Sequence, residues 1–340
     1  MAIRIKELNN AAEKTLILNT NERVLTSNAF RLALAEEYKL QAIDIELDFQ
    51  DQCLVIPAFR KASLLGLKGS TFILGAGFDK TGDFALNLST SYADIISHLL
   101  AELAGLNLKD TRLELRTTQT LPGSLSYSDK VELIVDLNKS CTERLKGFSQ
   151  STRRNMRQPF KQGFHFKIDN SLELLKDFYP LYLKHMHAIG SLPHSWEFFA
   201  ALHARCQTAL SLFIGYMNDT PVVASFAFIN GEELYGAWLG MDPTYKKHNL
   251  FLTMLWSITE YCEQTGIKTY NLGRSSTGSN AYEFKRRFAD EIRPIHYYQL
   301  ALAKPQTSRS AIYSSAAWLI RNSPPFVMNT LSRHLLHKFY

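Results

Sequence analysis

The sequence predicts an α/β protein built of two tandem units, each with a mixed central sheet flanked by helices. Three observations support this class. The chain has 340 residues, which is enough for two domains of ordinary size. Hydrophobic residues make up 46% and charged residues 21%, as in globular proteins. In both halves, segments with period-two alternation recur between segments with helical spacing.

The first unit is predicted over residues 1–138. Apolar residues recur at helical spacing in two segments, and Ser27 or Asn28 can cap the first of them, so helices are expected at 26–38 and 91–107. Alternating and β-branched residues predict a strand pair within 43–61 that turns around Asp51. The same pattern predicts strands at 70–78, 110–118 and 130–137, with residues 121–129 as a loop.

The second unit is predicted over residues 139–303. Residues 140–168 are expected to be mainly helical, and further helices are expected at 171–190, with a break at Pro180, at 195–206 and at 250–266. Asn218-Asp219 predicts a hairpin turn, and strands are predicted at 209–219, 220–231, 233–243, 268–276 and 293–302. The last two strands flank a glycine- and serine-rich loop and a short basic helix.

Residues 304–340 form a separate extension. Two amphipathic helical stretches are split by Pro324-Pro325, and every charged residue in the segment is basic. Such a segment either docks on the body of the protein or lies on an anionic membrane surface.

Charge and cysteine usage limit the partners and the compartment. The formal net charge of +6 favours anionic partners such as nucleotides, RNA or lipid headgroups. The four cysteines are far apart, which predicts four buried thiols rather than disulfides or a zinc site. The polar N-terminus predicts no signal peptide, and no apolar run is long enough to span a membrane. The cytoplasm is therefore expected, with contact at the inner face of the cytoplasmic membrane through residues 304–340 as an open alternative.

A basic helix is the first candidate binding element. The stretch "SQSTRRNMRQPFKQG" places Arg153, Arg154, Arg157 and Lys161 on a helix that Ser149 or Ser151 can cap. A helix N-terminus beside clustered guanidinium groups favours a phosphate. A solvated basic face explains the same pattern equally well.

Three histidines fall within "HMHAIGSLPHSWEFF". His187 and His194 do not have the spacing of metal ligands on a helix, and no HExxH motif is present, so no metal is predicted. The glycine and proline between them indicate a loop, and His194 is a candidate for lining a substrate cleft.

The stretch "YNLGRSSTGSNAYEFKRRF" is the main candidate for chemistry. Gly273 allows a positive φ or a close backbone approach, and Arg274 follows at the end of the strand. Aromatic residues then anchor a helix that runs to Phe288 and presents Lys285, whose charge can stabilise an oxyanion. A solvated surface helix is the alternative. The chain contains no GxGxxG, P-loop or GxSxG motif.

The order of elements in the second unit resembles the acetyltransferase (GNAT) fold. Together "STRRNMRQPFKQGF", "HMHAIGSLPHSWEFF" and residues 242–300 resemble Fem-type transferases, in particular the FemAB-like proteins encoded with exosortase and exopolysaccharide systems. The resemblance covers about residues 54–300 and implies two GNAT-like domains and amide formation on an amine acceptor. In the peptidoglycan members the donor is aminoacyl-tRNA and the acceptor is a nucleotide- or lipid-linked muropeptide.

The resemblance also implies roles for individual residues. Phe284-Lys285 matches a pair whose lysine lies by the reacting carbonyl. The basic helix matches the place where acceptor phosphates are held, which implicates Arg153, Arg154 and Arg157. The remaining candidates for substrate contact are Tyr282, Arg274, Gly273 and Asn271.

The donor is left open between aminoacyl-tRNA and acyl-CoA, and no tightly bound cofactor is expected. GNAT enzymes that use coenzyme A carry a glycine-rich basic turn before the central helix, whereas this chain has "YKKHNLFL" there, without glycine. Leu250 and Phe251 are expected to crowd the approach. Lys246 and Lys247 still offer charge, and Asn249 can adopt a positive φ.

Three functions remain open. The first is an acyl- or aminoacyltransferase acting on a cell-envelope, peptidoglycan or exopolysaccharide precursor. The second is an acyl-CoA-dependent N-acetyltransferase acting on a small amine or amino sugar. The third is a non-catalytic module that binds tRNA or an anionic membrane.

Overall fold

A computed structural model gives the fold of the protein. It describes residues 3–8, 23–62, 70–75, 83, 91–105, 112–121 and 126–299, together with residues 320, 321, 332 and 336. Most of the extension 304–340 and part of the predicted strand 70–78 lie outside the described residues.

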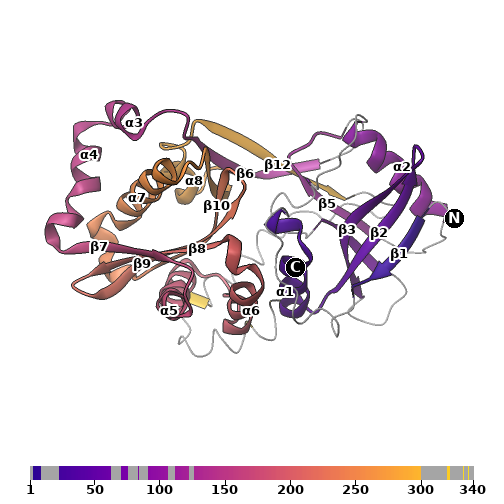
Figure 1. Ribbon diagram of the computed structural model, residues 1–340, viewed down its shortest axis with the longest axis horizontal. Helices are drawn as coiled ribbons and strands as arrows, with labels where there is room; N and C mark the ends of the chain where they lie inside the picture. Colours follow the sequence, from indigo (N-terminus) through magenta and orange to yellow (C-terminus); the bar gives the residue numbers. More distant parts are fainter. Residues whose placement is uncertain are drawn as a thin grey trace.

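The described strands form one continuous sheet of twelve that runs through both lobes of an elongated molecule (Figure 1). Their order across the sheet is β1-β2-β3-β4-β5-β12-β6-β11-β10-β9-β8-β7. The strands of the N-terminal side are β1 (Ile3–Glu7), β2 (Gln41–Phe49), β3 (Gln52–Ala62), β4 (Ser70–Leu74), β5 (Arg112–Thr117) and β6 (Ser126–Asp136). The later strands are β7 (Phe164–Asp169), β8 (Leu210–Met217), β9 (Thr220–Asn230), β10 (Glu233–Met241), β11 (Thr269–Ser276) and β12 (Glu291–Gln299).

Helices cover both faces of the sheet in the C-terminal lobe. One face carries α5 (Leu172–Ile189) and α6 (Trp196–Cys206), and the other carries α7 (Leu250–Thr265) and α8 (Asn280–Lys285) (Figure 1). Two short helices, α3 (Cys141–Gly147) and α4 (Gln150–Arg157), lie on the α7 side. In the N-terminal lobe α2 (Tyr92–Gly105) packs on the sheet. The predicted α/β class with a mixed sheet is confirmed, because β4–β5 and β10–β11 are parallel pairs and the other pairs are antiparallel.

The late strand β12 joins the two lobes. It pairs antiparallel with β5 on one side and with β6 on the other, so that Tyr297 lies opposite both Arg116 and Tyr127. β6 in turn pairs with β11. The predicted domain boundary after residue 138 stays a prediction, since β6 precedes it in sequence and pairs only with strands that follow it.

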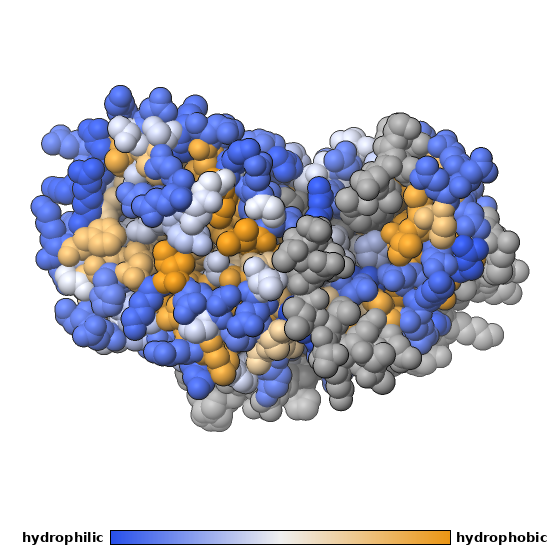
Figure 2. Space-filling model, in the orientation of Figure 1, coloured by the Kyte–Doolittle hydropathy of each residue, from blue (hydrophilic) through white to orange (hydrophobic). Residues whose placement is uncertain are grey.

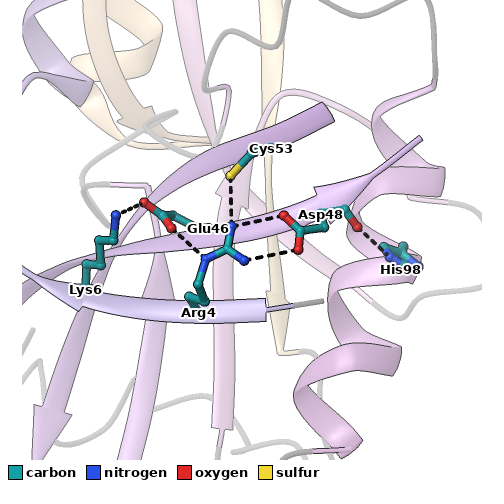
Figure 3. Close-up of polar contacts among 6 residues, drawn as sticks. All are labelled: Arg4, Lys6, Glu46, Asp48, Cys53 and His98. Atoms are coloured by element: carbon teal, nitrogen blue, oxygen red, sulfur yellow. Dashed lines mark hydrogen bonds and ion pairs between the residues drawn. The ribbon is translucent and has the colours of Figure 1, made fainter. Parts of the chain in front are cut away.

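Cross-strand ion pairs fix the edge strand β1 to β2 (Figure 3). The Arg4 guanidinium lies 2.9 Å from Glu46 and 3.0 Å from Asp48, and Lys6 also pairs with Glu46. Arg4 also donates to Cys53 Sγ at 3.5 Å. Cys53 is exposed, so the prediction of four buried thiols is wrong at this position. Cys53 is the second residue of β3, where burial alternates and the side chains of Cys53 and Val55 face solvent while those of Leu54 and Ile56 are buried.

Several predicted elements differ from those observed. Residues 164–169 form β7 rather than helix, because Gly163 ends the preceding turn with a φ of +85° and alternating Phe164, Phe166 and Ile168 then pair with β8. α5 continues through Pro180, so the predicted break is wrong. Residues 126–129 belong to β6 rather than to a loop.

The hairpin predicted at Asn218-Asp219 is confirmed. Both residues have positive φ, 48° and 62°, as a two-residue turn of this type requires.

The C-terminal extension touches the body where it is described. Ser332 Oγ donates to the Pro193 carbonyl oxygen, and Leu336 packs against the core shared by α5 and α6. These positions fit docking on the body. No helix among the described residues is long and apolar enough to cross a membrane.

A contact between lobes ties α1 (Asn28–Tyr38) to the start of α6. The Glu37 carboxylate accepts hydrogen bonds from Ser195 N at 2.8 Å and from Ser195 Oγ at 2.6 Å, and His194 Nδ1 lies 3.4 Å away. Glu36 pairs with Arg205 at 2.7 Å. Burial raises the pKa of Glu37, but His194 and the two Ser195 donors together outweigh it, so the pKa lies below its ordinary value.

We predict that Glu37→Gln lowers the free energy of unfolding by about 1–2 kcal/mol at pH 7, because the two Ser195 donors bond to different carboxylate oxygens and an amide would present an NH2 group to one of them. The pKa of Glu37 is lowered by folding, so its contribution is present above the ordinary value and is lost as the pH falls through the folded value. Urea unfolding should therefore show that the difference in free energy of unfolding between the wild type and Glu37→Gln is smaller at pH 4 and below than at pH 7. Glu36→Gln is the control. The Glu36 side chain is 45% exposed, so this substitution should lower the free energy of unfolding by less than Glu37→Gln does. A gap that stays constant with pH would contradict this account.

Candidate active site

The parallel strands β10 and β11 pair only over their first three residues. The register runs from Glu233 opposite Thr269 to Tyr235 opposite Asn271 and goes no further. Beyond that point both strands are irregular: β10 shifts register against β9 between Gly236 and Trp238, and β11 shifts against β6 between Asn271 and Arg274. Two bulges at the same height end the pairing, so the following backbone groups of β10 and β11 do not satisfy each other.

Gly273 is the tightest point between these strands. Its φ is +72°, and a Cβ there would lie 2.3 Å from the Gly236 carbonyl oxygen. The Asn271 side chain holds this turn, because its Oδ1 accepts from Gly273 N–H at 2.9 Å. Gly273 therefore allows the close approach that its sequence position suggested.

Unsatisfied polar atoms gather where the pairing ends. Asn271 is fully buried, and its Nδ2 has no hydrogen-bond partner within the described residues. The same holds for the hydroxyl of Tyr235, the residue opposite Asn271. Buried polar groups of this kind are normally hydrogen-bonded, so this pair is a candidate for contact with a ligand.

Arg274 faces the strands that join the lobes. It is exposed, and its Nη1 donates to Tyr297 Oη on β12 at 3.0 Å. The Arg116 guanidinium lies 5.2 Å from the centre of the Tyr297 ring. Arg274 is also opposite Glu132 of β6, whose side chain is fully buried. Arginines from β5 and β11 thus meet around one tyrosine.

Lys285 is the last residue of α8. Ser279 caps this helix by accepting from Tyr282 N–H, and Tyr282 and Phe284 pack partly buried against the α7 side of the core. The helix ends at Lys285 instead of running to Phe288, because the Lys285 carbonyl oxygen accepts from Phe288 N–H in a closing turn. Lys285 is half-buried.

Aromatic contacts fix the position of this turn. Phe288 is buried, and its ring lies 5.9 Å from that of Phe284 and 5.1 Å from that of Phe148, between α3 and α4. Arg286 pairs with Glu283 on the surface at 2.8 Å. The backbone that carries Lys285 is therefore held by packing, while its neighbour Arg286 belongs to the solvated face.

The N-terminus of α7 follows β10 through the short helix η4 (Pro243–His248). Lys246, Lys247 and Asn249 are exposed, and Asn249 has the positive φ expected, 56°. Its side chain makes no capping bond, and the first turn of α7 holds no acidic residue. Leu250 is buried and Phe251 beside it is half-buried, and the expectation that they crowd the approach to this helix end stays a prediction.

The basic helix α4 lies beside α7, since Thr253 Oγ1 of α7 donates to the Met156 carbonyl oxygen at 3.2 Å. Arg153 is half-buried and donates to the Leu145 carbonyl oxygen at 3.4 Å. Arg154 and Arg157 are exposed. Arg153 is thus directed back toward α3, which leads to Phe148 and its contact with Phe288.

His194 reaches the same strands from the opposite face. It is buried, stacks on Phe198 at 4.4 Å and meets the Trp238 ring of β10 at 5.5 Å. Its packing role in the α1–α6 contact is clear, and its role in binding stays a prediction. Within the described part of the chain no cluster of histidine, cysteine or acidic side chains could hold a metal ion.

Sequence reasoning missed Tyr235, Glu132 and Tyr297. Gly236 inside the strand "ELYGAWLG" was an available signal, because an isolated glycine in a strand often marks a bulge. Glu132 and Tyr297 carried no such signal, since only the pairing of distant strands brings them to this place.

Comparison with known proteins agrees with this geometry. Residues 146–286 match the family described as "Acetyltransferase (GNAT) domain". No curated protein matches the chain in sequence. The GNAT part of the resemblance and the predicted acyltransferase class are confirmed by this match, which covers the separated strands, α4, α7 and Lys285.

Solved structures share the fold across nearly the whole chain. The crystal structure of FemX aligns with a TM-score of 0.63 at 11% identity and covers 92% of this chain and 100% of that one. A conserved protein of unknown function from Bacteroides thetaiotaomicron aligns with a TM-score of 0.57 at 13% identity, over 88% and 100%. The C-terminal DUF2156 domain of a proposed lysylphosphatidylglycerol synthetase from Agrobacterium fabrum aligns with a TM-score of 0.55 at 11% identity, over 95% and 97%. The tandem GNAT-like architecture expected from the sequence is confirmed.

We predict that Gly273→Ala lowers the free energy of unfolding by about 2–4 kcal/mol, because it adds a clash with the Gly236 carbonyl oxygen to the strain of positive φ. Gly278→Ala is the matched control: its φ is +74° and a Cβ there meets nothing within 4 Å, so it should cost about 1 kcal/mol. Urea unfolding midpoints compare the two variants. If both variants lost the same free energy of unfolding, the close approach of β10 and β11 would not constrain position 273.

Proposed function

We propose that this chain is an amide-forming acyl- or aminoacyltransferase that acts on an amine of a cell-envelope or exopolysaccharide precursor. One observation carries the proposal. Within the residues that match the GNAT domain, β10 and β11 part beyond Tyr235 and Asn271, and β11 then leads through one short loop to α8 and Lys285. The parting strands present backbone groups that no longer pair with each other, and α8 supplies a cation.

Lys285 has a defined task in this reaction. The amine nitrogen of the acceptor attacks the acyl carbonyl carbon, a C–N bond forms, and the carbonyl electron pair moves to oxygen. The lysine ammonium stabilises this oxyanion. The oxyanion collapses, the bond from carbon to the donor oxygen or sulfur breaks, and the proton lost by the amine neutralises the leaving group.

Arginine placement supports an anionic acceptor. Arg153 leans toward α3 and the Phe148–Phe288 contact, and Arg274 faces the strands between the lobes. Phosphate groups of a nucleotide- or lipid-linked precursor suit guanidinium groups in such positions. The resemblance to FemAB-like proteins encoded with exosortase systems motivates the proposed precursor class.

Acyl-CoA is the second candidate donor, beside aminoacyl-tRNA. The open N-terminus of α7 favours it, because uncapped N–H groups beside Lys246 and Lys247 suit a pyrophosphate. The acceptor would then be a small amine or an amino sugar.

We predict that Lys285→Ala lowers transfer at least 100-fold, the loss typical when an oxyanion-stabilising group is removed. The assay follows label from aminoacyl-tRNA and, separately, from acetyl-CoA into a cell-envelope extract, and the donor that works identifies the donor class. Arg286→Ala is the matched control, because it removes the adjacent cation of the solvated face and should leave transfer unchanged. Equal activity of the wild type, Lys285→Ala and Arg286→Ala would contradict the proposal.

A further inference from the structure

The far end of the C-terminal lobe exposes apolar side chains beside cations. We propose that this outer edge, formed by α4, the short helix η2 (Pro159–Gln162) and β7, binds the surface of an anionic lipid bilayer. Its members are Arg154, Arg157, Phe160, Lys161 and Ile168. The proposal does not depend on the donor or acceptor of the transfer reaction.

The apolar part of the outer edge is held in place by its own packing. Phe160 is 42% exposed, yet its ring lies 5.5 Å from that of Phe164 and 6.4 Å from that of Phe166. Alternation along β7 puts Phe164, Phe166 and Ile168 on one face, and Ile168 is 38% exposed. Exposed apolar side chains that adjoin on one surface and are rimmed by polar residues are typical of an interaction surface.

The cations of the outer edge are available to a partner. Arg154, Arg157 and Lys161 are exposed, and none makes an ion pair within the part of the chain that the structure describes. Two exposed carboxylates border the edge: Asp169 follows Ile168 at the end of β7, and Asp219 lies 4.0 Å from His165, whose side chain alternates to the other face of the strand. The members of the edge around Phe160 itself are cations.

Position and shape favour a bilayer over a nucleic acid. β7 is the last strand of the sheet, at the end of the molecule away from the N-terminus (Figure 1). Figure 2 shows hydrophobic side chains grouped over this end and bordered by hydrophilic ones. A projecting edge can insert Phe160 and Ile168 among headgroups while the cations meet lipid phosphates. A phosphate backbone would use the cations and gain little from Ile168.

Vesicle sedimentation with the full-length protein tests the proposal. We expect binding to vesicles of phosphatidylcholine with one quarter phosphatidylglycerol, weaker binding at high salt, and little binding to pure phosphatidylcholine. Phe160→Ser should weaken binding roughly tenfold. Arg157→Gln/Lys161→Gln should weaken it roughly 30-fold.

Matched controls remove similar groups elsewhere. Val55→Thr alters a side chain of the other lobe that is 52% exposed, and Lys39→Gln/Lys176→Gln removes two exposed cations, so both should bind like the wild type. Ile168→Thr provides a second apolar test if the thermal unfolding midpoint of Phe160→Ser falls.

Three results would overturn the proposal. The wild type could fail to bind anionic vesicles. The wild type could bind anionic vesicles while the outer-edge variants bind as tightly as the control variants. That result would place binding on another surface, such as residues 304–340. The variants could lose affinity for duplex RNA while vesicle binding stays intact, which would make the edge a nucleic-acid surface.

Discussion

The pairing of β12 with both β5 and β6 is the contact on which the rest of the structure depends. β12 lies late in the chain but in the middle of the sheet, so it closes a ladder that would otherwise end at β5. Its pairing holds β6 in place, and β6 is the partner against which β11 bulges between Asn271 and Arg274. The geometry of the candidate active site therefore follows from contacts between strands far apart in sequence.

The bulges on β10 and β11 turn a continuous sheet into a place for chemistry. A regular parallel pair would satisfy its backbone groups internally and leave nothing for a ligand. Gly236 and Gly273 instead bring the strands close at one point, after which no pairing continues. After this point Arg274 is directed toward Tyr297 on β12. Lys285 follows at the end of α8, whose position is fixed by aromatic packing.

Local chemistry explains which features could be predicted from the sequence. The hairpin at Asn218-Asp219, the positive φ of Asn249 and the strand before Gly273 depend on a few neighbouring residues. β7 was predicted as helix because its six residues follow two helical turns and short apolar runs are ambiguous. The Glu132–Arg274 juxtaposition and the contact of His194 with Trp238 could not be predicted, because they need the pairing of distant strands and the docking of α6. Pro180 was misjudged because packing of α5 outweighs one lost hydrogen bond.

The central claim is that the donor is held where β10 and β11 part, within reach of Lys285. The most direct measurement is a crystal structure of the protein soaked with a non-transferable donor analogue, either an acyl-CoA thioether or a stable aminoacyl-nucleoside amide. The account predicts density for the acyl group beside Gly236–Trp238 and Asn271–Arg274, with the Lys285 ammonium directed at its carbonyl oxygen. Density for the analogue elsewhere on the protein, with only solvent density where β10 and β11 part, would contradict the account.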